Sequence, residues 1–449
     1  MKRALGLILT AIVAIVMYNL PIMTSMTEPQ KITAIIFLIA AILWIFEIIP
    51  LYTTSFVILI LEVLWLLPKI EGVKATTFLA PFFSTTILLF LGGFVLAKGL
   101  ESYKIDELVA ESILNRTGGK PSLTILAFLG VSGFLSMWMS NTAVAALMLA
   151  VTLPVVRKLE DKNYARALLI SIAFGANIGG MATPVGTPPN AIALDYLKKA
   201  GTNINFAKWV GFGLPFVIIL ILVTWLLLLV LFPHKVEKID MRISADTSRR
   251  KDPRVKVVVA VSIITALLWL TESVHKIDSA YVALLPVLVY FSFNILERKD
   301  FNSLNWDVLI LMGGGLSLGE AFKASGLGEY IVSSLGITSL PFSAQLALLA
   351  GITAIITNFM SNTSTAALVI PLAIGLNLDP VHQAILVVAV GLSASASMLL
   401  PISTPPNAIV YSSGELRVID MLKTGFAIVV IQLLLLTTFE RFMISLIIR

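Results

Sequence analysis

The amino-acid sequence contains the tetrapeptide Met-Ser-Asn-Thr twice, at 139–142 and 360–363. Each copy lies inside a long run without Asp, Glu, Lys or Arg; the runs extend over 121–156 and 341–378. Polar side chains surrounded by hydrocarbon are costly unless they are paired. We therefore expect each Ser-Asn-Thr triplet to bind a polar ligand.

These runs belong to a chain that is 58% hydrophobic and only 13% charged, with a mean hydropathy of +0.95. So little charge over 449 residues is typical of a polytopic membrane protein and excludes a soluble domain. The absence of cysteine excludes a disulfide framework and thiolate metal sites. The net charge of +6 comes from basic residues that flank apolar segments, so it indicates membrane topology and not nucleic-acid binding.

The hydropathy pattern predicts about eleven transmembrane helices, because a bilayer core of ~30 Å needs about 20 apolar residues. The predicted spans are 4–22, 32–50, 51–67, 79–99, 165–198, 209–232, 256–274, 279–296, 306–323, 381–412 and 421–446. The two runs that carry the triplets remain as hairpins between these spans. The predicted fold is thus all-α and membrane-spanning.

The basic residues predict the orientation of these spans, since cytoplasmic loops are rich in Lys and Arg. The longest polar connection, 233–255, is the most basic and is expected in the cytoplasm. Together with the adjacent Lys256, its basic residues are Lys235, Lys238, Arg242, Arg249, Arg250, Lys251 and Arg254. Counting spans from this loop places the N-terminus in the cytoplasm and the C-terminus outside.

The two halves of the sequence repeat each other. Ser140-Asn141-Thr142 recurs as Ser361-Asn362-Thr363 at an offset of 221, and the hexamer 187–192 recurs identically as 404–409 at an offset of 217. In the predicted topology the spans before the two hairpins run in opposite directions. This pattern predicts an inverted repeat, which in secondary transporters places the substrate site at the bilayer midplane between the repeats.

Each triplet permits two interpretations: a water-exposed turn between ordinary spans, or the tip of a re-entrant hairpin that stops inside the membrane. We favour re-entrant hairpins at 121–156 and 341–378, because the tips are uncharged and small residues follow them. The Thr-Pro-Pro-Asn segments predict broken helices over 165–198 and 381–412, because two prolines remove two N–H donors and leave carbonyls free. A simple proline kink is the alternative.

Free carbonyls together with Ser, Thr and Asn oxygens are hard neutral ligands that suit an alkali cation. The helix that follows each tip offers unpaired N–H groups and partial positive charge to an anion. Two such tips facing each other could hold both ends of a dicarboxylate. The motifs contain no Arg or Lys, so bound cations and helix ends must balance the anion's charge.

The doubled Ser-Asn-Thr, each followed by Thr-Pro-Pro-Asn, resembles the divalent anion/sodium symporter family of di- and tricarboxylate carriers over about 30–447. The resemblance implies a homodimer with a fixed scaffold domain and a transport domain that moves like an elevator. The corresponding division is N-terminal scaffold helices at 1–78, a first repeat at 79–232, the cytoplasmic loop at 233–255, further scaffold helices at 256–305 and a second repeat at 306–449. It also implies an integral protein of a prokaryotic plasma membrane.

The family resemblance assigns a role to particular residues. One sodium site would use Ser136, Ser140, Asn141 and the backbone at Gly186. The other would use Thr357, Met360 through its backbone, Asn362 and Ser403. The substrate carboxylates would contact Asn141, Thr142, Asn362 and Thr363, with Thr187, Pro188, Thr404 and Pro405 completing the binding site. Sodium ions are the coupling ions in such carriers, and no other cofactor is implied.

The predicted function is secondary active transport of di- or tricarboxylates of the succinate, malate, fumarate and citrate class. Sodium-coupled symport is favoured because both candidate cages are complete in neutral oxygens; the alternative is a sodium-independent dicarboxylate exchanger of the same family. An intramembrane enzyme is disfavoured because Ser140 and Ser361 have no neighbouring base in the sequence. An anion channel is disfavoured because alternating access explains the inverted repeat better.

Overall fold

The computed structural model describes residues 2–202, 204–239 and 252–448, and within these ranges every regular element is a helix. This confirms the predicted all-α class. By length and composition, seven helical segments in the described ranges can cross a bilayer, and seven shorter helices are apolar. Part of the predicted cytoplasmic loop lies outside the described residues, together with its basic side chains Arg242, Arg249, Arg250 and Lys251.

The N-terminal part of the chain forms six helices before the first hairpin. They are α1 (Lys2–Tyr18), α2 (Glu28–Ile45), α3 (Leu51–Leu61), α4 (Ala75–Leu79), α5 (Thr85–Ser102) and α6 (Ile105–Leu114). α6 is too short and too charged to span a membrane, and its buried residues are Asp106, Ala110 and Leu114.

The first triplet divides its uncharged run into two helices, α7 (Pro121–Ser136) and α8 (Asn141–Val156), an arrangement that fits a re-entrant hairpin and a pair of ordinary spans equally. Both helices pack on α9 (Lys162–Gly179), which is buried along nearly its whole length. Glycines allow α7 and α9 to approach closely, because a Cβ on Gly179 would lie 2.2 Å from the carbonyl oxygen of Gly133. The chain then breaks and continues as α10 (Pro188–Lys199) and α11 (Phe206–Leu231).

The middle of the chain contains one longer helix and four short ones. They are α12 (Arg254–Leu270), α13 (Glu272–His275), α14 (Ser279–Val282), α15 (Leu284–Ser292) and α16 (Arg298–Asn302). The predicted span 279–296 is therefore divided at Ala283 into α14 and α15.

The C-terminal part repeats the order of the first hairpin and the first broken helix. It consists of α17 (Trp306–Ser325), α18 (Leu327–Ser334), α19 (Phe342–Ile356), α20 (Asn362–Gly375), α21 (Pro380–Ser393), α22 (Pro405–Tyr411) and α23 (Val418–Ile448). The second triplet lies at the turn between α19 and α20, and the second Thr-Pro-Pro-Asn begins α22 after the break at 394–404.

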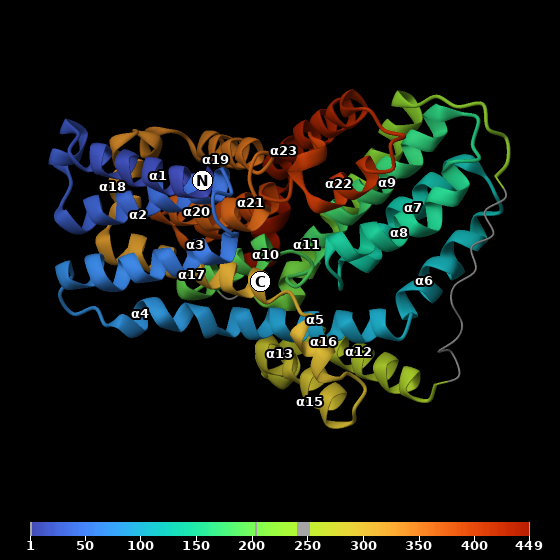
Figure 1. Cartoon of the computed structure of the whole chain (residues 1–449), viewed down its shortest axis with the longest axis horizontal. Helices are drawn as coiled ribbons and strands as arrows, with labels where there is room; N and C mark the ends of the chain where they lie inside the picture. The colour runs from blue at the N-terminus through green and yellow to red at the C-terminus, as the bar shows by residue number, and fades with distance from the viewer. Residues whose placement is uncertain (1, 203, 240–251, 449) are drawn as a thin grey trace.

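The two hairpins lie in different halves of the elongated molecule (Figure 1). α7, α8 and α9 lie on the right in Figure 1, whereas α19 and α20 lie left of the middle, where α19 packs on α21 and α20 packs on α17, α18 and α21. The broken helices meet between them, since α10 contacts both α20 and α21, and α22 contacts both α8 and α9. Each half of the chain thus contributes a tip and a break to the centre.

Candidate substrate and cation sites

The triplets begin their helices in the same way. Ser140 is the N-cap of α8, and its hydroxyl accepts a hydrogen bond of 3.2 Å from the Ala143 N–H. Ser361 caps α20 and accepts one of 3.1 Å from the Ser364 N–H. Serine is preferred at this position because its oxygen pairs an otherwise free helical N–H. The remaining N–H groups of the first turn stay available to an anion.

In the first tip, a hydroxyl and an amide from opposite arms of the hairpin meet. The Ser136 hydroxyl donates to Asn141 Oδ1, and both side chains belong to the predicted first cation site. A Cβ on Gly180 would lie 2.8 Å from Asn141 Oδ1 and 3.1 Å from the Gly186 carbonyl oxygen. These two oxygens therefore face a common space that only a glycine at 180 leaves open. Such a set of neutral oxygens fits an alkali cation.

The second tip has the same pairing at the equivalent positions. The Thr357 hydroxyl lies 2.9 Å from Asn362 Oδ1 and 2.5 Å from the Ala394 carbonyl oxygen in the break. A hydroxyl has one hydrogen, so it can donate to only one of these two acceptors at a time. Two acceptor oxygens thus flank the Thr357 hydroxyl, and the three neutral oxygens together are ligands that suit an alkali cation. The Ala394 carbonyl is a member of this set that the sequence did not indicate.

The other two residues predicted for the second cation site have different surroundings. The Ser403 hydroxyl lies 3.1 Å from the carbonyl oxygen of Asn358 and 3.0 Å from its side-chain Oδ1. It also accepts a hydrogen bond of 3.1 Å from the Leu400 N–H. Met360 lies just before the triplet and is buried. The described contacts therefore join Thr357 to Asn362 but connect Ser403 to Asn358.

Equivalent asparagines form hydrogen bonds to the backbone of the breaks in the two helices. Asn190 Nδ2 donates to the carbonyl oxygens of Gly180 at 3.0 Å and Thr183 at 2.8 Å. Asn407 Nδ2 donates to those of Ser397 at 3.2 Å and Leu400 at 3.0 Å. Carbonyls that the prolines leave without helical partners are satisfied in this way. The asparagine that ends each Thr-Pro-Pro-Asn motif thus stabilises the backbone of the break.

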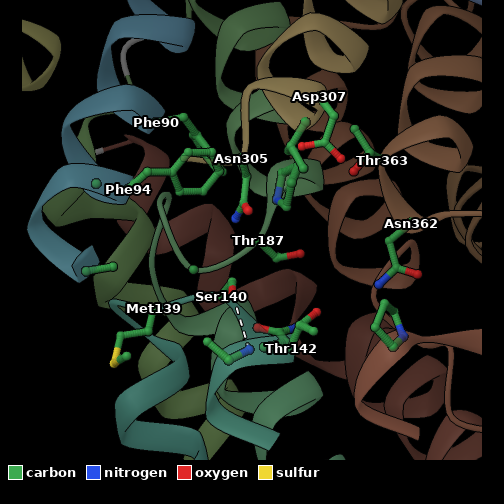
Figure 2. Close-up of a pocket in the computed structure, with 18 of the residues that line it drawn as sticks. Phe90, Phe94, Met139, Ser140, Thr142, Thr187, Asn305, Asp307, Asn362 and Thr363 are labelled. Atoms are coloured by element: carbon green, nitrogen blue, oxygen red, sulfur yellow. Dashed lines mark hydrogen bonds between the residues drawn. The ribbon is translucent and has the colours of Figure 1, made fainter. Parts of the chain in front are cut away.

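A cavity of about 800 Å³ lies between the tips and the breaks. Its size is typical of small-molecule sites. All eight residues predicted to contact substrate line it, namely Asn141, Thr142, Thr187, Pro188, Asn362, Thr363, Thr404 and Pro405. Figure 2 shows Ser140 and Thr142 on one side of the cavity, Asn362 and Thr363 on another, and Thr187 between them.

The cavity also contains residues that the sequence analysis missed. α5 contributes Phe90 and Phe94, and the segment that begins α17 contributes Asn305 and Asp307 (Figure 2). Lys98 of α5 also lines the cavity. Lys98 forms an ion pair of 3.3 Å with the Glu101 carboxylate, so its charge is partly balanced. Its position inside a predicted span, five residues after Gly93, was a usable signal, because a lysine in a span is rare.

Asn177 on α9 is a further missed residue, and it lies at the wall of the cavity with 1% exposure. Its Nδ2 donates to Thr404 Oγ1 at 3.2 Å and to Asn407 Oδ1 at 3.0 Å. It thereby joins the first repeat to the second. No motif surrounds it in the sequence, and its partners are more than two hundred residues away.

The fold and this cavity together define a helical membrane transporter for a small polar solute. A protein-family model described as citrate transporter matches residues 41–391. The chain belongs to this citrate transporter family, which confirms the predicted relationship to the divalent anion/sodium symporters.

Individual relatives are also membrane transporters. An uncharacterized transporter of Methanocaldococcus jannaschii is 35% identical over 417 residues, which cover 90% of this chain and 92% of the relative. The sodium-dependent dicarboxylate transporter SdcS of Staphylococcus aureus is 30% identical over 431 residues, with 85% of this chain and 80% of the relative covered.

Solved structures of transporters share the fold. The YdaH transporter of Alcanivorax borkumensis superposes with a TM-score of 0.56 at 13% identity, covering 82% of this chain and 88% of that one. MtrF of Neisseria gonorrhoeae, from a class of antimetabolite efflux pumps, gives 0.53 at 13% identity, covering 81% and 82%. At this identity the likeness concerns the fold alone.

Proposed function

We propose that this protein is a secondary active transporter that carries a di- or tricarboxylate together with sodium. The observation that carries the proposal is the duplication of one arrangement around the cavity. Each tip combines a hydroxyl–asparagine pair with a helix N-terminus, and each faces a break that brings a backbone carbonyl, that of Gly186 or of Ala394, close to the pair. The relative that is named a sodium-dependent dicarboxylate transporter supports both the solute class and the ion.

The first sodium ion is proposed to bind Ser136, Ser140, Asn141 and the Gly186 carbonyl. The space bounded by Asn141 Oδ1, Gly180 and the Gly186 oxygen supports this assignment. The second is proposed to bind Thr357, Asn362 and the Met360 carbonyl, with Ser403 nearby. The convergence of Thr357, Asn362 Oδ1 and the Ala394 oxygen supports this site and adds a ligand to it.

The substrate is proposed to lie between the two tips. Asn141 and Thr142 at the start of α8 would bind one carboxylate, and Asn362 and Thr363 at the start of α20 the other. A carboxylate is favoured at these positions because helix N-termini present free N–H groups and partial positive charge. The two sodium ions would neutralise most of the charge of a dicarboxylate such as succinate, malate or fumarate, or of citrate.

The transport cycle is proposed to follow an elevator mechanism in a homodimer. The hairpins and broken helices would form the transport domain, with re-entrant tips and inverted repeats, and the helices of 1–78 and 256–305 would form the scaffold. The lining of the cavity is consistent with such a division, since residues 50–52 and 303–305 of the proposed scaffold line it together with the tips and the breaks. The N-terminus is assigned to the cytoplasm and the C-terminus to the outside of a prokaryotic plasma membrane.

Sodium-independent exchange is the second candidate, and one observation favours it. The Ser403 hydroxyl is engaged with Asn358 and Leu400, which leaves the second cation site with fewer free ligands. Uptake of labelled succinate into proteoliposomes separates the two candidates. Uptake driven by an inward sodium gradient alone is expected for the symporter.

The same assay can contradict the proposal. Uptake that requires internal unlabelled dicarboxylate and ignores sodium would identify an exchanger. The absence of uptake under both conditions, with succinate, malate, fumarate and citrate, would overturn the assignment of the substrate class.

A further inference from the structure

The two threonines of the Thr-Pro-Pro-Asn motifs occupy equivalent sequence positions but have different hydrogen-bond partners. Thr187 and Thr404 both precede a helix and both line the cavity. The Thr187 hydroxyl makes no capping bond to its helix. The Thr404 oxygen accepts two hydrogen bonds, one of 3.3 Å from the Asn407 N–H and one of 3.2 Å from Asn177 Nδ2.

The orientation of the Asn177 amide follows from a chain of fixed partners. Asn407 Nδ2 faces two carbonyl oxygens, those of Ser397 and Leu400, which only accept hydrogen bonds. Asn407 must therefore turn its Oδ1 toward Asn177. Asn177 in turn must present its Nδ2, and the two hydrogens of that group point to Asn407 and to Thr404. The opposite amide orientation would place acceptors against acceptors.

This arrangement determines what the Thr404 hydroxyl can do. A hydroxyl oxygen has two lone pairs and one hydrogen. Both lone pairs of Thr404 receive N–H groups, so only its hydrogen remains free, and the described residues offer it no acceptor. Because Thr404 lines the cavity, an acceptor on a bound molecule is the natural partner.

We propose that Asn177 is a positioning residue that makes the Thr404 hydroxyl an obligate hydrogen-bond donor to a substrate carboxylate. The proposal rests on the proposed carboxylate transport and deepens it. The first repeat supplies the amide and the second repeat supplies the hydroxyl. The equivalent of Asn177 in the second repeat is Ala394, which has no side-chain donor, so Thr187 receives no such bond. The two sides of the carboxylate site therefore differ. The Thr404 hydroxyl can only donate a hydrogen bond to the substrate, whereas the Thr187 hydroxyl is free to donate or to accept one.

A double-mutant cycle tests this proposal with succinate uptake at saturating sodium. Thr404→Val removes the hydroxyl at nearly constant shape and should raise KM about tenfold, the effect of ~1.4 kcal/mol of binding free energy. Asn177→Ala should raise KM severalfold, because the hydroxyl is then free to turn away. If Asn177 acts through Thr404, the double variant should have the KM of Thr404→Val alone.

The matched control uses the equivalent threonine. Thr187→Val combined with Asn177→Ala should show independent, multiplicative effects on KM, since Asn177 makes no bond to Thr187. If the role of Asn177 were purely structural, the effect of Asn177→Ala on KM would multiply with the effect of each threonine variant. The sodium concentration for half-maximal uptake would then change as well. Multiplicative effects in the Thr404 cycle would overturn the proposal.

Asn177→Asp provides a second variant of nearly the same shape in case Asn177→Ala fails to fold. The acid carries at most one donor hydrogen, so it cannot serve both Asn407 and Thr404, and KM should again rise. An unchanged KM in this variant would also contradict the proposal. Failure of the wild-type protein to take up any carboxylate would instead disprove the proposed function, so the two failures are distinguishable.

Discussion

The two tips share their ligand-bearing positions but differ in how they are held. In both, a hydroxyl at the end of the first arm meets the asparagine of the triplet, as Ser136 meets Asn141 and Thr357 meets Asn362. In both, a serine caps the second arm. The groups that could touch ions and solute are thus duplicated closely.

The hydrogen bonds that join each tip to its break differ between the repeats. In the first repeat the Thr183 hydroxyl donates to the Met137 carbonyl at 2.6 Å and accepts from the Gly186 N–H at 3.1 Å. In the second repeat Ser403, which is equivalent to Gly186, supplies the hydroxyl that joins tip and break. In both repeats a hydroxyl of the break therefore bonds to a carbonyl of the tip, but it comes from Thr183 in the first repeat and from Ser403, the equivalent of Gly186, in the second.

The second tip has an additional anchor in Asn358, the equivalent of Met137. Its Nδ2 donates to the carbonyl oxygens of Ala354 at 2.7 Å and Ala396 at 3.3 Å. Its Oδ1 accepts from the Leu399 N–H at 2.9 Å and also lies 3.0 Å from the Ser403 hydroxyl. The two repeats thus share the proposed binding groups more strictly than the contacts that position these groups.

The largest expected effect comes from removing the shared groups. Asn141→Ala and Asn362→Ala should each lower succinate uptake at least about a hundredfold, because each asparagine serves a proposed cation site and a carboxylate at once. Uptake into proteoliposomes is the measurement, with expression and oligomeric state as controls. Near-normal uptake by either variant would remove that tip from the site and break the equivalence of the repeats.

The anchor of the second tip should matter for stability. Asn358→Ala is expected to lower the free energy of unfolding by about 2–3 kcal/mol, because it leaves buried backbone groups unpaired. Its counterpart Met137→Ala loses only packing and should cost less, since its carbonyl bond to Thr183 remains. Thermal unfolding in detergent provides the measurement. Equal losses in both variants would show that the amide network adds nothing to the second tip.

The cation sites should respond separately to loss of their hydroxyls. Ser136→Ala and Thr357→Ala should each raise the sodium concentration for half-maximal uptake about five- to tenfold, because each removes one neutral ligand. Ser403→Ala should change it less, because that hydroxyl is bonded to Asn358. Sodium titration of succinate uptake measures all three. A Ser403 effect as large as that of Thr357 would place Ser403 among the ligands, and an unchanged sodium response in Ser136→Ala would move the first site elsewhere.

The smallest effect concerns the short helices that precede the hairpins. In α6 burial raises the pKa of the Asp106 carboxyl to about 6, whereas the equivalent residue at the start of α18 is the buried Leu327. A raised pKa means that the folded state binds more protons than the unfolded state between about pH 4 and 6, so stability falls as the pH rises through this window.

The variant Asp106→Asn should therefore be more stable than the wild type at pH 8 by about 1 kcal/mol. The gain is limited because the amide is also a buried polar group. The difference should vanish near pH 4, as measured by thermal unfolding at a series of pH values. A difference that does not depend on pH would show that the Asp106 carboxylate carries no cost of burial.

Much of the fold could be predicted because its signals are local. Proline at the start of α7 and α10, serine before α8 and α20, and uncharged runs of helical length all act within a few residues. Hydrocarbon leaves a backbone few alternatives to the helix, so hydropathy predicted the helical class, whereas the division of 279–296 into α14 and α15 was not predicted. The eight positions that line the cavity and are proposed to contact substrate could be selected for the same reason, since repeated polar motifs in apolar runs stand out.

Other features could not be predicted because they depend on distant parts of the chain. The engagement of Ser403 with Asn358 and the carbonyl of Ala394 beside Thr357 arise only when a hairpin packs against a break. Asp307 reaches the cavity only because α17 begins beside it. A single sequence contains no record of such pairings.

Periodicity, charge and proline act locally, so the sequence alone predicts an all-helical membrane protein with two polar tips and two broken helices. Which oxygens lie side by side and which hydroxyl hydrogens remain free depends on how the helices pack. Asn177 is an example, since its amide orientation follows from partners in the other repeat. Hydrogen-bond direction is a property of a whole network, and the network exists only after the repeats have packed together.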